Sequence, residues 1–204
     1  MRQISKAAEP PSLTAHRKTE FADYENYRAK DDLRERLVGE QKRLCCYCMQ
    51  RIDVGAMMKI EHWQSQSRFQ AQQLNYRNLL GACLGGDGLP SGLQHCDTKK
   101  GNRDLSWNPA EPVHHIETRL KYELDGTIRA NERAFDRQLS DVLNLNLPQF
   151  KNNRKRVLDA LLEWWKAEKP VPKAAIQRKI DEWANARILV PYSQVAVWWL
   201  RQRP

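Results

Sequence analysis

The spacing of its cysteines limits what this chain can fold into more than any other feature. Cys45 and Cys48 form a C-x2-C pair, and Cys83 and Cys96 supply a second pair with twelve residues between them. Four thiolates from two such pairs can hold zinc in a tetrahedron, at Zn–S distances of about 2.3 Å. The spacing therefore predicts a structural zinc site that ties short apolar segments and turns together.

Other uses of these cysteines remain open. Cys46 falls outside the four-ligand set, and His95 is a substitute ligand beside Cys96. A redox-active C-x2-C pair is expected after a strand in a thioredoxin-like unit, whereas this pair follows a segment with the pattern of a charged helix. Ordinary reduced thiols are the remaining alternative. No apolar run follows the positive charges of the N-terminus, so we expect no secretory signal and a reducing cytoplasm, where disulfides are disfavoured.

The composition narrows the class of protein further. The 204 residues carry 34 Lys and Arg against 25 Asp and Glu, a formal net charge of +9, and 41% are hydrophobic. This suits one or two small globular domains. No apolar run approaches the roughly 20 residues needed to cross a bilayer, so we expect no membrane segment. Residues 151–204 hold 12 of the basic and only 5 of the acidic residues, which favours a polyanion such as nucleic acid as a partner.

Sequence patterns divide the chain into four regions. We expect an extended arm at residues 1–22 and a zinc-site region with a leading helix at 23–108. A hairpin with a helical extension is expected at 109–147, and a basic, Trp-rich helical region at 148–204. The leading helix spans about 23–44, because Leu33, Leu37 and Val38 have helical spacing. The predicted fold class is therefore α+β and mostly helical, with N-terminal and C-terminal helices flanking a small zinc-stapled core.

The later regions contain one hairpin signal and several helix signals. Asp125-Gly126 lies between two short alternating segments, which is typical of a hairpin turn. Prolines separate the predicted helices, which cover 131–145, 148–166, 173–187 and 192–203. Five of the seven tryptophans lie in the last region: Trp164, Trp165, Trp183, Trp198 and Trp199. Core or protein-interface packing is favoured for them over base stacking, and Trp198-Trp199-Leu200 is a candidate exposed docking patch.

Polar residues suited to hydrolytic chemistry lie between and after the cysteine pairs. Glu61 and His62 stand at the end of a predicted strand. Neighbouring strand residues point to opposite faces, so one of them can hold a metal while the other holds a water. The further polar candidates are Asn78, Asp97, Lys99 and Lys100.

This order of motifs resembles the zinc-knuckle HNH, or ββα-metal, endonucleases. The matching residues run from the C-x2-C pair through Glu61-His62, Asn78-Leu79-Leu80 and Cys83 to Cys96-Asp97-Thr98-Lys99-Lys100-Gly101. Over residues 30–160 the chain is also similar to the PtuB family, the HNH subunit of Septu-type and retron-associated antiphage systems, at Leu33, Leu37, Gln41, Tyr122, Asp125-Gly126, Leu143, Asn146 and Arg154. Two features depart from the HNH pattern: Asp97 stands where Asn or His is commoner, and a glycine-rich insertion precedes Cys96.

The resemblance implies a fold and a set of roles. It implies that residues 23–108 form an HNH nuclease core. In this core the strand with Glu61 and His62 pairs with a strand at 78–82, and a helix that starts near Asp97 completes a ββα unit. His62 would be the general base, and Glu61 and Asp97 would hold Mg²⁺ or Mn²⁺. The resemblance makes Asn78 an orienting residue. Lys99 and Lys100 either touch phosphates flanking the cleaved bond or lie on a solvated helix face.

The implied activity is metal-dependent hydrolysis of phosphodiester bonds, with DNA favoured over RNA. The implied partners are an ATPase subunit of the ABC or SMC-like PtuA type and, in retron-associated systems, a reverse transcriptase with its msDNA. The implied role is an effector of antiphage defence. The alternative is a non-catalytic, zinc-stabilised adaptor that binds nucleic acid or a protein.

Overall fold

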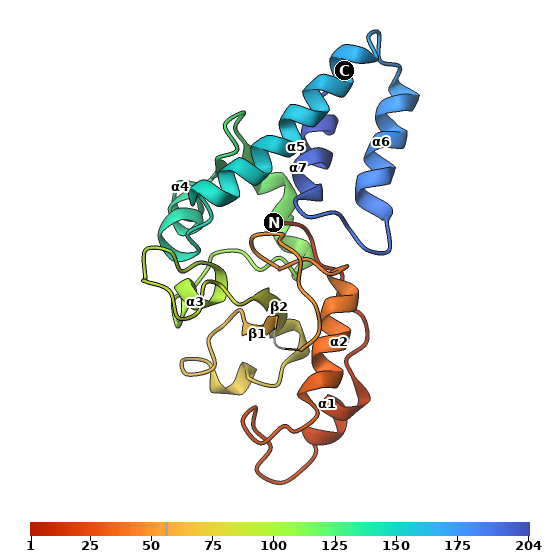
Figure 1. The fold of residues 1–204 in the computed structure, drawn as a ribbon. Helices are drawn as coiled ribbons and strands as arrows, with labels where there is room; N and C mark the ends of the chain where they lie inside the picture. Colours follow the sequence, from red (N-terminus) through yellow and green to blue (C-terminus); the bar gives the residue numbers. More distant parts are fainter. Residues whose placement is uncertain (56) are drawn as a thin grey trace.

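The computed structural model describes residues 1–55 and 57–204, and it has two two-stranded sheets among helices (Figure 1). The α+β, mostly helical class is confirmed. The helices are α1 (Pro11–His16), α2 (Lys30–Glu40), α3 (Cys96–Lys100), α4 (Arg133–Arg137), α5 (Pro148–Ala167), α6 (Lys173–Asn185) and α7 (Ser193–Arg201). The strands are β1 (Met58–His62), β2 (Leu79–Cys83), β3 (Leu120–Tyr122) and β4 (Ile128–Ala130). Among the helices of the described residues, none has both the length and the apolar composition that spanning a bilayer requires.

The first sheet carries the motif residues. β1 pairs antiparallel with β2, with Met58 opposite Cys83 and His62 opposite Leu79. Every residue of β2 is buried, as its apolar sequence predicts. Helices α2 and α3 both contact β2 and lie on either side of the hairpin in Figure 1. The predicted strand pairing and the helix after it are therefore both present.

The N-terminal region differs from the expected extended arm. It contains α1, and its apolar residues Met1, Ile4 and Leu13 are buried. Burial of these side chains removes apolar surface from water, which favours a packed segment over a free arm. The backbone N–H of Ile4 donates to the Pro109 carbonyl at 2.8 Å and fixes this segment to the middle of the chain.

The leading helix is shorter than its pattern predicted. Helix α2 buries Leu33, Leu37 and Val38 as expected, but it begins only at Lys30. Asp23 and Asn26 exchange hydrogen bonds between side chain and backbone at 2.8 and 3.1 Å. Such local bonds offer the backbone an alternative to the helix, so residues 23–29 turn instead.

The second hairpin is joined tightly to α5. The buried Arg154 side chain donates from Nε to the Gly126 carbonyl at 2.5 Å and from Nη2 to the Leu145 carbonyl at 2.7 Å. A Cβ on Gly126, whose φ is +84°, would lie 2.0 Å from the Lys151 carbonyl oxygen, so only glycine fits this turn. Gly126 and Arg154, both singled out by the sequence analysis, thus meet where the hairpin joins the helix.

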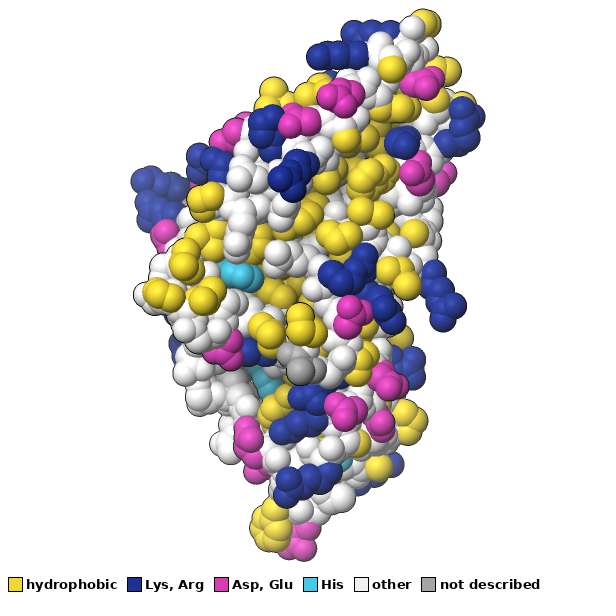
Figure 2. Space-filling model, in the orientation of Figure 1, with side chains coloured by type: hydrophobic (Ala, Val, Ile, Leu, Met, Phe, Trp, Pro, Cys, Tyr) yellow, Lys and Arg dark blue, Asp and Glu magenta, His cyan; other side chains and the backbone are white. Residues whose placement is uncertain are grey.

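The C-terminal helices form one end of the molecule (Figure 1). Helix α7 packs against α5 and α6, and Trp199 and Leu200 are buried between them. Trp164, Trp165, Trp183 and Trp198 pack partly buried on the same core. The tryptophans therefore serve packing, and the expectation of an exposed patch at residues 198–200 is wrong. On the face drawn in Figure 2, Lys and Arg are scattered among acidic and apolar side chains.

Candidate functional site

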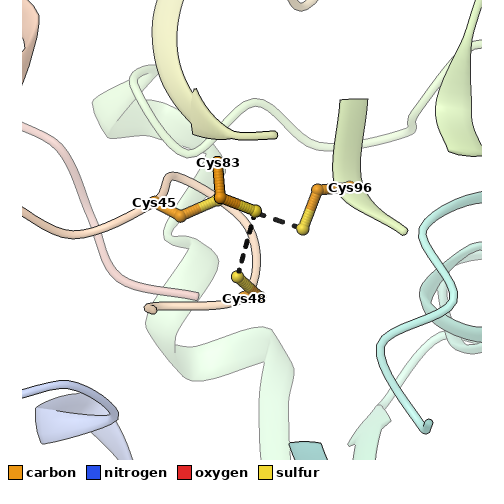
Figure 3. Close-up of side chains that lie close together, drawn as sticks. All are labelled: Cys45, Cys48, Cys83 and Cys96. Carbon is orange, nitrogen blue, oxygen red and sulfur yellow. Dashed lines mark hydrogen bonds between the residues drawn. The ribbon is translucent and has the colours of Figure 1, made fainter. Parts of the chain in front are cut away.

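The four predicted zinc ligands come together from three elements. Cys45 and Cys48 lie in the turn after α2, Cys83 ends β2 and Cys96 begins α3. Their sulfur atoms lie within 4.8 Å of one another, with 3.9 Å between Cys45 and Cys96 and 3.7 Å between Cys48 and Cys83. A zinc tetrahedron with bonds of about 2.3 Å has sulfur–sulfur edges of about 3.8 Å. The four side chains point toward one another (Figure 3) and fit a structural zinc ion.

Backbone contacts bring the two cysteine pairs together. The N–H of Cys46 donates to the Gly81 carbonyl at 3.0 Å, which holds the C-x2-C turn against β2. The glycine-rich insertion returns to the site where the N–H of His95 donates to the Gly85 carbonyl at 2.9 Å. A Cβ on Gly85, whose φ is +65°, would lie 2.4 Å from the His95 carbonyl oxygen, so glycine is required there.

The converging sulfur atoms, and not their acidity, separate the four ligands from the fifth cysteine, because burial raises the pKa values of Cys48 and Cys96 as well as that of Cys46. Burial opposes ionisation of Cys45, but hydrogen bonds from the surrounding thiols hold its pKa well below the ordinary value. Burial and then the neighbouring Cys45 raise the pKa of Cys46 well above the ordinary value, so Cys46 stays a neutral thiol. The Nδ1 atom of His95 lies 3.3 Å from the sulfur of Cys96. From there a ring N–H can donate a hydrogen bond to the Cys96 thiolate, so His95 can orient a ligand while the four sulfurs bind the metal.

Glu61 lies in a second, separate cluster. Its side chain is 2% exposed, and its Oε1 accepts hydrogen bonds from the Tyr47 hydroxyl at 2.7 Å and the Lys100 ammonium at 2.9 Å. Burial, and then hydrogen bonding and repulsion from Asp97, raise the pKa of Glu61 well above its ordinary value, while Lys100 opposes the rise. Asp97 lies one turn before Lys100 on α3, so the helix that brings the Lys100 ammonium to Glu61 also brings Asp97 to the same side of β1.

His62 is held by the backbone on one side of its ring. Its Nε2 lies 3.0 Å from the carbonyl oxygen of Gln73, which can only accept a hydrogen bond, so Nε2 carries the proton. Nδ1 then has a free lone pair, and within the described part of the chain no hydrogen bond reaches it. Burial lowers the pKa of His62 below its ordinary value. Tyr24 packs against the ring at 4.4 Å between centroids.

The buried Asn78 organises the backbone around His62. Its Oδ1 accepts from the N–H of Gln64 at 2.7 Å, and its Nδ2 donates to the carbonyls of Gln64 at 3.0 Å and Gln72 at 3.1 Å. Gln72 precedes the residue whose carbonyl holds the His62 ring. The amide thus has the place that the orienting role requires.

The structure corrects the expectation for one of the two lysines, Lys100. Lys100 was expected to reach a phosphate or solvent, but its side chain is 1% exposed and pairs with Glu61. Lys99 is half-buried, and its Nζ donates to the Ser91 carbonyl at 2.8 Å. A buried ammonium must be paired, and the nearest carboxylate supplies its partner. The sequence reasoning also missed Tyr47, for which the only signal is its position inside the C-x2-C turn.

The donor set of the second cluster fits a hard cation. In residues 1–55 and 57–204, the four cysteines are the only group of three or more His, Cys, Asp and Glu residues whose ligand atoms converge. Glu61 and Asp97 offer two carboxylates. Mg²⁺ is usually bound by one or two carboxylates, with waters and substrate phosphates completing its shell. The two carboxyl groups therefore suit a site that substrate completes.

Comparison with known proteins does not extend this description. No protein-family model matches the chain, and no curated protein matches its sequence.

Proposed function

We propose that this chain is a metal-dependent endonuclease of the HNH type, with residues 58–100 as its ββα unit. One observation carries the proposal: the ion pair between Lys100 of α3 and Glu61 of β1 places the helix that bears Asp97 against the strand that bears Glu61 and His62, and the His62 ring has a free nitrogen that can accept a proton. A four-cysteine zinc site needs none of these polar groups, and burying a carboxylate costs free energy even when, like Glu61, it has an ion-pair partner.

The residues divide the reaction between them. His62, kept neutral by burial, takes a proton from the attacking water at Nδ1. The hydrogen bond from Nε2 to Gln73 fixes the ring orientation, and Asn78 fixes the loop that carries Gln73. Glu61 and Asp97 hold the divalent cation. Mg²⁺ or Mn²⁺, when bound, offsets the negative charge that develops on the scissile phosphate and the departing oxygen.

The resemblance to PtuB proteins extends the proposal to partners. We propose DNA, in preference to RNA, as the substrate, and an ATPase of the ABC or SMC-like type as the regulating subunit. An antiphage effector role, in some systems beside a retron reverse transcriptase, belongs to the same proposal. The net charge of +9 supports binding to a polyanion.

One observation favours a second candidate function. The Lys100 ammonium already pairs with Glu61 at 2.9 Å, so this carboxylate has a partner without any bound cation. A zinc-stabilised binding module with no hydrolytic activity would have the same contact. Such an adaptor would bind nucleic acid or a protein and leave the phosphodiester bond intact.

Cleavage assays on the zinc-loaded full chain distinguish the two functions. Plasmid DNA and a structured RNA are incubated with Mg²⁺ or Mn²⁺, with the ATPase partner co-expressed in a parallel sample. His62→Ala is expected to lower the cleavage rate by roughly 10²–10⁴-fold. His16→Ala is a matched control, because His16 also contacts a backbone carbonyl, that of Asp23 at 2.9 Å, and packs on a tyrosine. Undiminished cleavage by His62→Ala, or no cleavage by the wild type in any sample, would contradict the proposal.

A further inference from the structure

Glu61 is bound by two residues to which the proposed reaction gives no role. Both Tyr47 and Lys100 donate to Oε1, at 2.7 and 2.9 Å. Two donors from different elements restrict the rotation of the carboxylate group. They therefore help to fix the direction in which Glu61 presents its oxygens.

Tyr47 connects this carboxylate to the zinc site. It lies between Cys46 and Cys48 in the C-x2-C turn, and its side chain is completely buried. Zinc binding at Cys45 and Cys48 fixes the backbone on both sides of Tyr47. The position of the Tyr47 hydroxyl, and through it that of Glu61, is thus set by the metal site.

Lys100 connects the same carboxylate to the strand that carries His62. Its ammonium donates to the His62 carbonyl at 3.0 Å as well as to Glu61. These two contacts fix the position of Glu61 relative to His62, its neighbour on β1. The positive charge also offsets repulsion between the Glu61 and Asp97 carboxylates.

We propose that Tyr47 and Lys100 are positioning residues that orient the Glu61 carboxylate for a divalent cation shared with Asp97, and that Tyr47 thereby couples the structural zinc site to the hydrolytic site. This inference rests on the proposed function, because it assigns Glu61 the role of a cation ligand. Partners that orient metal ligands typically contribute about 10–100-fold to metal affinity.

The test measures Mn²⁺ binding to the zinc-loaded full chain without substrate, by electron paramagnetic resonance. Tyr47→Phe removes only the hydroxyl and is expected to weaken Mn²⁺ binding by about 10–100-fold, with zinc content unchanged. The chain supplies a matched control in Tyr76→Phe. The Tyr76 hydroxyl donates to Glu40 at 2.7 Å and Lys6 pairs with the same glutamate, so this change breaks an equivalent contact elsewhere.

Cleavage rates measured against Mn²⁺ concentration provide a second readout. Tyr47→Phe is expected to need more Mn²⁺ and to approach the wild-type rate at saturation, whereas a purely structural role would not change the metal requirement. Lys100→Met also removes a positive charge that repels the cation, so Tyr47→Phe, which changes no charge, decides the question.

The outcomes separate this inference from the proposed function. Unchanged Mn²⁺ affinity in Tyr47→Phe, or an equal loss in Tyr76→Phe, would overturn the positioning role and leave the proposed function standing. Loss of zinc from Tyr47→Phe would also overturn it, because the hydroxyl would then be a structural support. Absence of Mn²⁺ binding by the wild type would overturn both.

Discussion

Replacing Asn78 by Ala should both destabilise the protein and disable the site. The side chain is 4% exposed and makes three hydrogen bonds to the backbone of Gln64 and Gln72. At a net of about 1 kcal/mol each, their loss lowers the free energy of unfolding by about 3 kcal/mol. For a chain of this length, about 2–4 °C per kcal/mol converts this to a fall in Tm of about 6–12 °C.

The same substitution releases the loop that carries the Gln73 carbonyl, so the His62 ring loses its fixed orientation. A misplacement of about 1 Å can cost about 100-fold in rate, and we expect a loss of this order in cleavage. Calorimetry and cleavage assays are performed on Asn78→Ala and on Asn131→Ala, whose side chain is exposed and makes a single hydrogen bond to Thr118. Equal melting temperatures for the two variants would refute the stability argument. Wild-type cleavage by a destabilised Asn78→Ala would refute the orienting role.

Three further predictions concern the metal sites and the base. Elemental analysis should find about one zinc per chain. Cys45→Ser should lose the zinc and unfold, because metal binding energy is folding energy at such sites, whereas Cys46→Ser should retain it. Less than about half an equivalent of zinc in the folded wild type would contradict this prediction. Asp97→Ala should raise the Mn²⁺ concentration needed for cleavage. Asp97→Asn should raise it less, because the amide oxygen can still bind the cation. An unchanged Mn²⁺ requirement in Asp97→Ala would contradict the ligand role of Asp97. In NMR titration the His62 ring should carry its proton on Nε2 and protonate below the ordinary pKa of histidine, because burial disfavours the cation. Activity that depends on the neutral ring should accordingly persist as the pH falls to that ordinary value, and a raised midpoint would contradict the assignment.

Residue spacing was enough to predict the zinc ligands, because two cysteine pairs supply the four thiolates of a tetrahedral site. Cys45 and Cys48 can reach one metal only from a tight turn, which neighbouring residues determine. The pairing of the strand at Glu61-His62 with the strand at 78–82 was expected from the resemblance and not from spacing. The pairing of Glu61 and Asp97 was expected only from the resemblance, because the two lie on different elements and no local pattern relates them.

The two lysines show where sequence reasoning fails. Lys99 and Lys100 are adjacent in a helix of five residues, too short for a periodic pattern to identify the buried face. Lys100 is buried because Glu61, on another element, lies within reach of its ammonium. Such a partner becomes visible only once the strand and the helix have been placed.

Burial of the terminal segments depends in the same way on distant partners. The apolar face of Trp199 and Leu200 was recognised, but α5 and α6 cover it, and no local signal shows that they do. At the N-terminus, Pro10-Pro11 suggested an extended arm. Proline also suits the first turn of a helix, and Pro11 begins α1.

The most direct test of the central claim is anomalous diffraction from crystals soaked in Mn²⁺, with data collected on both sides of the zinc and manganese absorption edges. We predict a zinc peak at the centre of Cys45, Cys48, Cys83 and Cys96, and a manganese peak between the carboxylates of Glu61 and Asp97. A manganese peak elsewhere, or none beside these two residues, would contradict the claim that they form the cation site of a hydrolytic centre.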